Sequence, residues 1–281
     1  MKKVLIVGLL FVTFVVNAQS FQGKATYKTH RKVDMKIGGG PNSTMSDAQK
    51  AQFEAMMKKQ FQKTFTLTFD KNTSVYKEEK KLNTNAGIPR GGINVMVMGS
   101  GGGNDVVYKN IKENRFVNKT EIMGKRFLIK DKLPKYDWKL TSETKNIGVY
   151  TCYKATYTRE VERTSMTVED GKMKEKKEKV DVVTTAWYTP SIPVSNGPGD
   201  YVGLPGLILE IKEGKQTIIC SEIVLNPKDK IKIDEPRKGK KVSQKQYEKI
   251  MAKKSKEMMD KFKNRRKGKG KGNSVEIRIG G

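Results

Sequence analysis

Two cysteines and one histidine are the side chains in this sequence that most readily carry out covalent or acid–base chemistry. Cys152 and Cys220 are the only cysteines, and no Cys-x-x-Cys motif is present, so their spacing does not indicate thiol–disulfide redox chemistry. In an oxidising compartment the pair favours a structural disulfide, whereas two separate buried thiols would act as small hydrophobic side chains. We expect the disulfide, which would close a loop of about 68 residues and contribute roughly 4 kcal/mol.

His30 is the single histidine. A Ser-His-Asp or Cys-His arrangement would have to use it, and the sequence has no Gly-x-Ser-x-Gly elbow to supply a nucleophile. A zinc site needs several His, Cys or carboxylate ligands close together, and the sequence contains no such cluster. We therefore assign no catalytic residue, no metal ligand and no cofactor. A hydrolase or redox enzyme whose site the sequence does not reveal is kept as an alternative.

Methionine pairs are a further source of chemistry, because thioethers are soft ligands for ions such as Cu(I). The pairs are Met56-Met57, Met96-Val97-Met98 and Met258-Met259. The first and last pairs sit at apolar positions of expected helices, where methionine is an ordinary core residue. A methionine-based soft-metal binder is the second alternative.

Large apolar residues and conformationally restricted positions are densest between residues 186 and 211. Four of the nine prolines fall between Pro190 and Pro205. Proline fixes φ, and glycine permits turns that other residues do not make. A backbone restricted in this way suits a mouth for an apolar ligand or a docking site for a partner, but it also suits a bent crossing that closes one end of a sheet. The candidate binding residues are Trp187, Tyr188, Tyr201, Leu204 and Pro205.

The hexapeptide Gly203–Ile208 and several shorter stretches form a recognisable set. The shorter stretches are Tyr108-Lys109-Asn110, Phe127–Asp131, Trp138-Lys139-Leu140, Thr151–Ala155 and Ala186–Pro190. Together they resemble the GLPGLI family, exported proteins of Bacteroidetes-type bacteria with no assigned biochemical role. The resemblance implies an outer-membrane TonB-type transporter as a partner and supplies no catalytic residue. A weaker resemblance of fold, to lipoprotein-carrier (LolA-like) half-barrels, implies a curved sheet that holds acyl chains.

The residues singled out above must be positioned mainly by β-strands. Residues 64–69 alternate strictly between polar and apolar side chains, which predicts a half-buried strand. Asp170-Gly171 lies between strand-like segments at 159–168 and 179–188, which predicts a β-hairpin. We therefore expect a mainly β (α+β) fold built on a curved antiparallel sheet. The more specific expectation is a LolA-like half-barrel.

Two capping-box patterns predict two peripheral helices. Ser46–Gln49 begins a helix expected over about Asp47–Lys63, and Ser243–Gln246 begins a second, basic helix. The chain is divided accordingly into a signal peptide at 1–18, a β-rich GLPGLI-type domain at 19–241 and a basic helix and tail at 242–281. Insertions are expected in the β-rich domain at about 38–63 and 82–104.

The first residues have the form of a secretory signal. Lys2-Lys3 precede an apolar run from Val4 to Val16, and Ala18 stands before an expected cleavage at Gln19. The run is shorter than the roughly 20 apolar residues that cross a bilayer. No cysteine lies near the junction to accept a lipid. We expect a periplasmic or secreted protein without a lipid anchor.

The chain is strongly basic, with 57 Lys and Arg against 30 Asp and Glu and a net charge of +27. Export removes nucleic acid as the expected partner, whereas anionic envelope lipids would attract the same charge. Lysine-rich faces that merely solvate the protein are the other interpretation. The main hypothesis is a non-enzymatic periplasmic or envelope-associated binding protein of the outer-membrane system, which carries a hydrophobic ligand or docks a membrane partner.

Overall fold

A computed structural model describes residues 21–31, 48, 55, 62–79, 105–169, 172–229 and 231–267. Twelve strands form one sheet in the order β12-β6-β5-β4-β3-β2-β1-β11-β10-β9-β8-β7. All neighbouring strands are antiparallel except β12, which pairs in parallel with β6. The strands are β1 (Gln22–Arg31), β2 (Thr64–Asp70), β3 (Thr73–Glu78), β4 (Val106–Asn110), β5 (Arg115–Ile122), β6 (Lys125–Lys132), β7 (Lys139–Ile147), β8 (Tyr150–Glu169), β9 (Lys172–Thr189), β10 (Leu207–Glu213), β11 (Gln216–Leu225) and β12 (Lys240–Val242).

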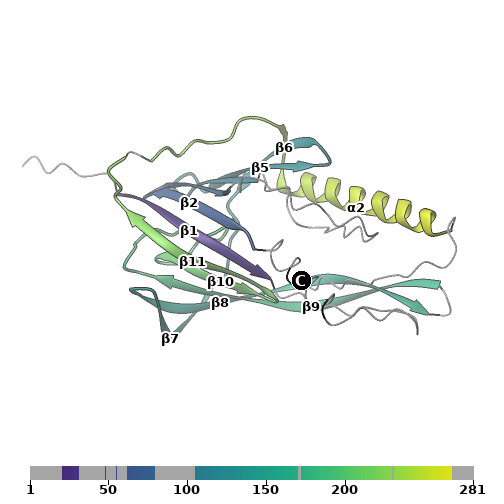
Figure 1. The fold of residues 1–281 in the computed structure, drawn as a ribbon, viewed down its shortest axis with the longest axis horizontal. Helices are drawn as coiled ribbons and strands as arrows, with labels where there is room; N and C mark the ends of the chain where they lie inside the picture. The colour runs from purple at the N-terminus through teal and green to yellow at the C-terminus, as the bar shows by residue number, and fades with distance from the viewer. Residues whose placement is uncertain are drawn as a thin grey trace, which may run out of the picture.

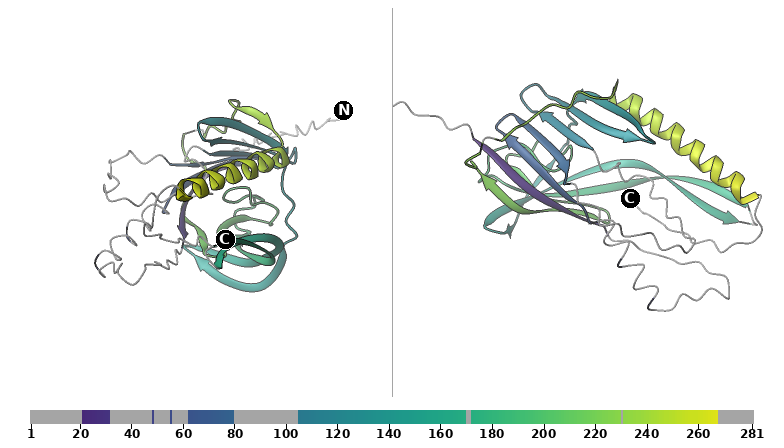
Figure 2. Two further views of the ribbon diagram at one scale, coloured as in Figure 1. Left: turned by 90° about the vertical axis from the view of Figure 1, so that its right-hand side faces the viewer. Right: turned by 45° about the horizontal axis from the view of Figure 1, so that its top comes forward.

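The sheet is open and curved, with β12 and β7 as its edges (Figures 1 and 2). Strands β2 to β6 form one meander and β7 to β11 form another, because within each group consecutive strands are neighbours. Strand β1 joins the two meanders by pairing with β2 on one side and with β11 on the other, from Gly23 opposite Leu225 to Arg31 opposite Gln216. We call β1 the seam strand.

Tyr27 of the seam strand reaches beyond its neighbour β11. Its hydroxyl donates a hydrogen bond of 2.7 Å to the carbonyl of Ile208 on β10, in a fully buried position. The β9–β10 register shifts between Ile208 and Glu210, and such a bulge leaves backbone groups out of the ladder. Tyr27 therefore gives a buried donor to a carbonyl beside the bulge, and the bond links the seam strand to β10.

The hairpin of β8 and β9 extends well beyond the rest of the sheet (Figure 1). The two strands pair continuously from Tyr153 opposite Tyr188 to Glu169 opposite Lys172, which confirms the predicted hairpin, while Asp170 and Gly171 lie outside the described residues. Strand β7 pairs with β8 only as far as Thr156. On the other side, β9 pairs with β10 as far as Thr184, which lies opposite Tyr157. Beyond Tyr157 and Thr184 the described part of the hairpin is a two-stranded arm.

A strap of residues 231–239 and the helix α2 (Gln244–Lys267) wrap around the β6 edge. Ile233 packs with Leu128 on one face of the sheet. Tyr247 and Ile250 pack with Phe127 on the other. Adjacent residues of a strand point to opposite faces, so the chain passes from one face to the other at β12. The predicted capping box is confirmed at the start of α2, where Gln246 N donates to Ser243 Oγ at 3.2 Å and Ser243 N donates to Gln246 Oε1 at 2.9 Å.

The mainly β class and the antiparallel sheet are confirmed, but within the described residues there is one helix, α2, instead of two. Most of the helix expected over Asp47–Lys63 lies outside the described residues. Ala48 and Ala55 are described within it, and both are helical. Its predicted end is wrong, because the carbonyl of Lys63 accepts the amide of Thr29 at 2.9 Å and the chain there already runs into β2. Sheet pairing decides the conformation at that point.

We predict that Tyr27→Phe lowers the free energy of unfolding by about 1–3 kcal/mol, because a buried carbonyl loses its donor. Chemical denaturation of purified protein measures the change. Tyr247→Phe is the matched control, since its hydroxyl makes only a 3.4 Å, partly buried contact with Thr120. Equal small losses in the two variants would contradict the role given to Tyr27.

Candidate functional site

The segment between β9 and β10 contains the predicted binding residues and is held mainly through its backbone. We call residues 190–206 the proline loop. Leu207 N donates to Ile192 O at 3.0 Å, and Ile208 N donates to Asn196 O at 2.9 Å. Asn196 also forms an isolated bridge with Val202. The start of β10 therefore fixes the loop from within.

Lys109 of β4 clamps the proline loop from the other meander. Its side chain is fully buried, and Nζ donates to Gly197 O at 2.7 Å and to Tyr201 O at 3.3 Å. Burial lowers the pKa of Lys109 to about 7, although nearby Asp200 raises it. The amide side chain of Asn196 adds a second link, accepting from Ser74 Oγ of β3 at 3.3 Å.

A cluster of aromatic rings supports the middle of the proline loop. We define the aromatic cluster as Tyr136, Trp138, Tyr157 and Tyr201, all half-buried. The ring of Tyr136 lies 5.3 Å from the ring centres of both Tyr157 and Tyr201. Trp138 Nε1 donates to Val202 O at 2.9 Å, so an indole fixes the loop backbone here.

The structure separates the predicted binding residues by burial. Leu204 is 1% exposed and Tyr188 is 6% exposed, and both belong to the main hydrophobic core. Tyr201 and Trp187 are half-buried, and Pro205 is exposed. In this conformation a ligand or partner can therefore reach three of the five candidates.

Trp187 lies among charged side chains. Lys145 Nζ is 4.4 Å from the centre of its ring and 2.8 Å from Glu210 Oε2. A cation over an indole face is attracted by the ring quadrupole, and here the same cation is also paired with a carboxylate. Trp187 therefore already has a cationic partner within the chain.

Cys152 and Cys220 are free and buried thiols, so the expected disulfide is not formed in this structure. Strands β9 and β10 separate β8 from β11, which places the two cysteine strands about 14 Å apart along the sheet. A disulfide requires Cα atoms within about 7 Å of each other. Burial raises the pKa of each thiol to about 11, and for Cys220 the charge interaction with Cys152 raises it further. The order of the strands therefore keeps the two thiols on separate strands that do not pair with each other.

The other candidates for chemistry do not form a site among the described residues. His30 is half-buried near the end of the seam strand, with its backbone opposite Thr217. No group of three or more His, Cys, Asp or Glu side chains within the described ranges is arranged to hold a metal ion. The side chains of the methionine pairs lie outside what the structure describes.

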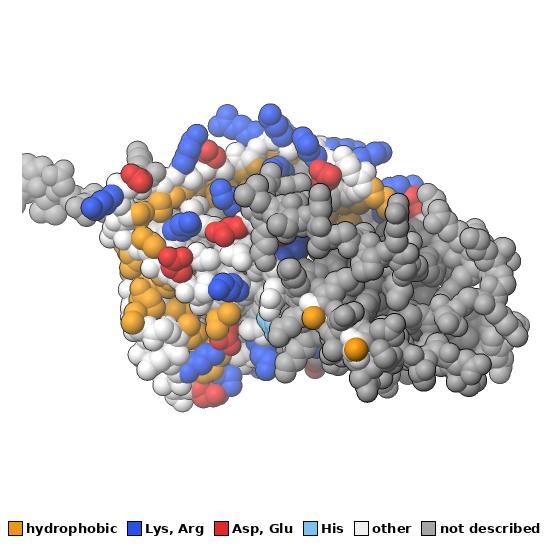
Figure 3. Space-filling model, viewed as in Figure 1, with side chains coloured by type: hydrophobic (Ala, Val, Ile, Leu, Met, Phe, Trp, Pro, Cys, Tyr) orange, Lys and Arg blue, Asp and Glu red, His pale blue; other side chains and the backbone are white. Residues whose placement is uncertain are grey.

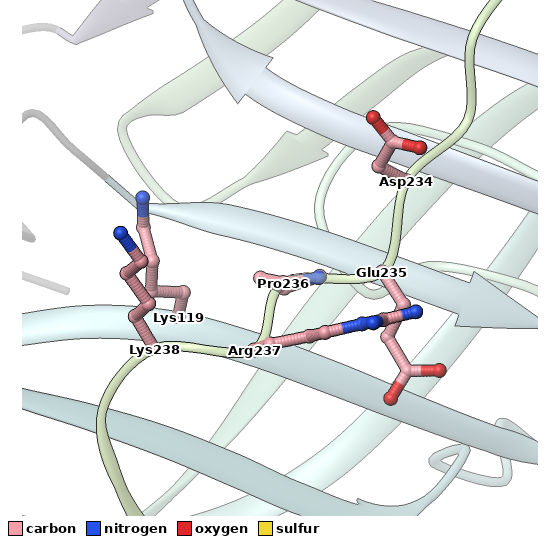
Figure 4. Close-up of a pocket in the computed structure, with 6 residues that line it drawn as sticks. All are labelled: Lys119, Asp234, Glu235, Pro236, Arg237 and Lys238. Carbon is pink, nitrogen blue, oxygen red and sulfur yellow. The ribbon is translucent and has the colours of Figure 1, made fainter.

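The β12–α2 side of the molecule contains a basic surface. Residues 237–267, which we call the basic edge, contain fourteen Lys and Arg but three Asp and Glu. Figure 3 shows Lys and Arg side chains along this side, over β5, β6 and the strap. The strap also borders a groove of about 520 Å³ (Figure 4), lined by Lys119, Asp234, Glu235, Pro236, Arg237 and Lys238.

The sequence predicted the basic run of this surface but missed the groove. Lys119 belongs to β5, more than a hundred residues from the strap, and no local pattern connects the two. Glu235 of the strap is not free to oppose these cations, because its carboxylate is paired with Arg115 at 2.9 Å and with Lys130 at 3.1 Å. Burial opposes ionisation of Glu235, but the hydrogen bonds from these two cations outweigh it and lower its pKa.

Comparison with protein families matches residues 138–210 to a family described as a protein of unknown function (Porph_ging). The match includes the proline loop and Trp138, Tyr157 and Tyr201, so this segment is similar to that family. The GLPGLI name stays an expectation. No curated protein matches the chain.

Among solved structures, PNGF-II is similar in two crystal forms, C2 and P21. The sequence identity is 16%, and the TM-scores are 0.47 and 0.46. Each match covers 83% of this chain and 33% of that one, so the chain spans a third of the length of PNGF-II. A likeness at this level does not define a function.

We predict that Leu204→Asp strongly destabilises the protein, because it places an unpaired charge in the core, at a cost of several kcal/mol. Thermal denaturation should show a large fall in Tm. Pro205→Asp is the control at the neighbouring, exposed position and should leave Tm nearly unchanged. A folded Leu204→Asp variant with an unchanged Tm would mean that Leu204 faces solvent or a ligand.

We predict that stability rises with pH between about 7 and 9. The ammonium of Lys109 loses its proton near pH 7 in the folded protein and near its ordinary 10.5 in the unfolded chain. Above pH 7 the unfolded state therefore binds more protons, and the free energy of unfolding rises by up to about 1.4 kcal/mol per pH unit. The thiols, whose folded pKa is raised, act in the opposite direction only above about pH 9.

Denaturation curves at pH 7, 8 and 9 measure this slope. Lys109→Met should abolish it, whereas Lys112→Met, at an exposed lysine in the turn after β4, should preserve it. The same slope in the wild type and in Lys109→Met would refute the assignment to Lys109.

Proposed function

We propose that this protein is a non-enzymatic, envelope-associated binding protein that docks on an anionic membrane surface through its basic edge. The observation that carries the proposal is the excess of fourteen Lys and Arg over three Asp and Glu in residues 237–267. Polybasic segments are attracted to anionic bilayers by about 1 kcal/mol for each Lys or Arg near the surface. Because these contributions add, a segment with this many Lys and Arg can hold a protein at a membrane.

The helix α2 suits a surface better than a bilayer interior. It contributes Tyr247 and Ile250 to the small core on β6, while Lys245, Lys249 and Lys253 are exposed. No helix in the described residues combines the length and apolar character needed to cross a membrane. The basic edge is therefore suited to lie against headgroups while the sheet supports it from behind.

Docking has more support than the carrying of a hydrophobic ligand. Leu204 and Tyr188, two of the residues expected at a ligand mouth, are core residues of this conformation. The alternative is that the protein carries a hydrophobic ligand, with acyl chains held in the hollow of a LolA-like half-barrel. Docking on a TonB-type transporter, which the family resemblance implies, would present Trp187, Tyr201 or Pro205 to a protein instead.

The absence of catalysis is part of the same proposal. A thiol nucleophile acts as the thiolate, and burial raises the pKa of both cysteines to about 11. Both thiols are therefore protonated at neutral pH. Their chemistry favours a structural role over a hydrolase or redox site. Export with cleavage before Gln19 places the protein in the compartment where such docking occurs.

Sedimentation with phosphatidylglycerol vesicles tests the proposal, with phosphatidylcholine vesicles as the uncharged comparison. We predict binding to the anionic vesicles at low salt and its loss at high salt, because screening weakens exposed charges. Replacing four exposed lysines of α2 by glutamine should weaken binding by roughly 100-fold or more, at about 1 kcal/mol each. The four are Lys245, Lys249, Lys253 and Lys256.

A charge-matched control replaces four exposed lysines elsewhere by glutamine, namely Lys24, Lys28, Lys139 and Lys212. This control should bind nearly as the wild type does. Equal losses in the two quadruple variants would point to net charge alone and would overturn docking through the basic edge. Equal binding to both kinds of vesicle would overturn it as well.

A further inference from the structure

The groove beside the basic edge has the geometry of an anion site. It forms where the strap crosses β5, and Figure 4 shows the side chains of Lys119 and Lys238 extending toward the same side. Its volume of about 520 Å³ exceeds what a phosphate group needs. The two lysines come from segments separated by more than a hundred residues, so the fold, rather than a local run of charge, brings them together.

The acidic residues of the groove are already neutralised. Glu235 is 25% exposed and is paired with both Arg115 and Lys130. Asp234 lies 3.2 Å from Lys232. Each carboxylate that lines the groove therefore has a cation of its own outside the lining.

The lysines of the groove have no such partner among the described residues. No carboxylate there lies within 4.0 Å of Lys119 or Lys238. Burial raises the pKa of the nearby Asp105 carboxyl, and the charge of Lys119 opposes that rise without pairing with it. Two ammonium groups on the same side of a groove repel each other, and an anion between them replaces repulsion by two attractions. The geometry therefore favours a bound anion over a bare pair.

The backbone holds both lysines in place. Lys119 belongs to β5 and pairs with Leu128 of β6. Lys238 is followed by Gly239, which has a φ of +145° and on which a Cβ would stand 2.8 Å from the carbonyl carbon of Phe127. Only glycine permits this approach, and Lys240 then enters β12 opposite Phe127. The backbone at both lysines is thus fixed, which reduces the entropy lost on binding to that of their side chains.

We propose that Lys119 and Lys238 bind a phosphate monoester, with Arg237 at the rim of the same groove. A monoester carries up to two negative charges and three terminal oxygens at neutral pH, so each ammonium group can take an oxygen of its own. A diester offers a single charge and two such oxygens. The site deepens the proposed membrane docking by naming the headgroup, and its lipid form rests on that proposal.

Vesicles of phosphatidic acid and of phosphatidylglycerol, each diluted with phosphatidylcholine to equal zeta potential, test the preference. We expect the wild type to bind the monoester vesicles about tenfold more tightly. Lys119→Gln combined with Lys238→Gln should remove this preference while phosphatidylglycerol binding falls only as far as in a charge-matched control. That control is Lys125→Gln combined with Lys132→Gln, at exposed positions of β6 outside the groove, and it should keep the preference.

A titration with a soluble phosphate ester tests the groove in the absence of a membrane. Calorimetric titration with glycerol 3-phosphate should give binding to the wild type that is lost in the groove variant and kept in the control, whereas glycerophosphocholine, a diester, should not bind. Binding of glycerol 3-phosphate without binding to either vesicle would support the groove with a free phosphate ester as its ligand, and would overturn membrane docking.

Vesicle binding without monoester preference, together with no binding of glycerol 3-phosphate, would overturn the groove and leave docking intact. The loss of a residue that lines an open groove should not unfold the protein. Unchanged Tm values of both double variants are therefore required before the binding data are compared, and single Lys238→Gln replaces the double variant if its Tm falls.

Discussion

The seam strand β1 holds the two meanders in one sheet, because it pairs with β2 on one side and with β11 on the other. Each meander forms from neighbours in sequence, but only β1 brings the two together. Lys109 belongs to the first meander and Gly197 to the second, so the buried clamp on the proline loop exists because β1 sets their distance. The hydroxyl of Tyr27 extends the same connection to the bulge at Ile208. A small error in this one register would disconnect the loop from its support.

Local patterns predicted local structure well and long-range burial poorly. Strict alternation at Thr64–Asp70, the hairpin signal at 170–171 and the capping box at Ser243 each produced the expected element. A lysine in a short strand normally indicates a solvent face, so nothing in the sequence marked Lys109 as buried. Its partners are backbone carbonyls, which have no sequence signature. The disulfide was expected because an exported chain with two cysteines in strands favours one, but two strands lie between β8 and β11 and both thiols are free.

The basic surface illustrates why a charge count does not locate a binding site. Composition identifies the run of lysines near the end of the chain, but the cations open to an anion are those left after ion pairing. Glu235 engages Arg115 and Lys130, and the strap carries this carboxylate across the sheet to reach them. What remains in the groove combines a residue of β5 with one of the strap. The ion pairs formed in the folded protein therefore locate a binding site better than the net charge does.

The two-stranded arm of β8 and β9 has a consequence for how the protein tolerates change. Its outer backbone groups, beyond Tyr157 and Thr184, have no third strand to bond with in the described structure, and an isolated ribbon of two strands is marginal in water. Amide protection should therefore fall gradually from the base of the arm toward its tip, since each rung can open without disturbing those below. Mutations near the tip then cost the fold little, so this part of the chain is free to vary under selection while the sheet stays fixed.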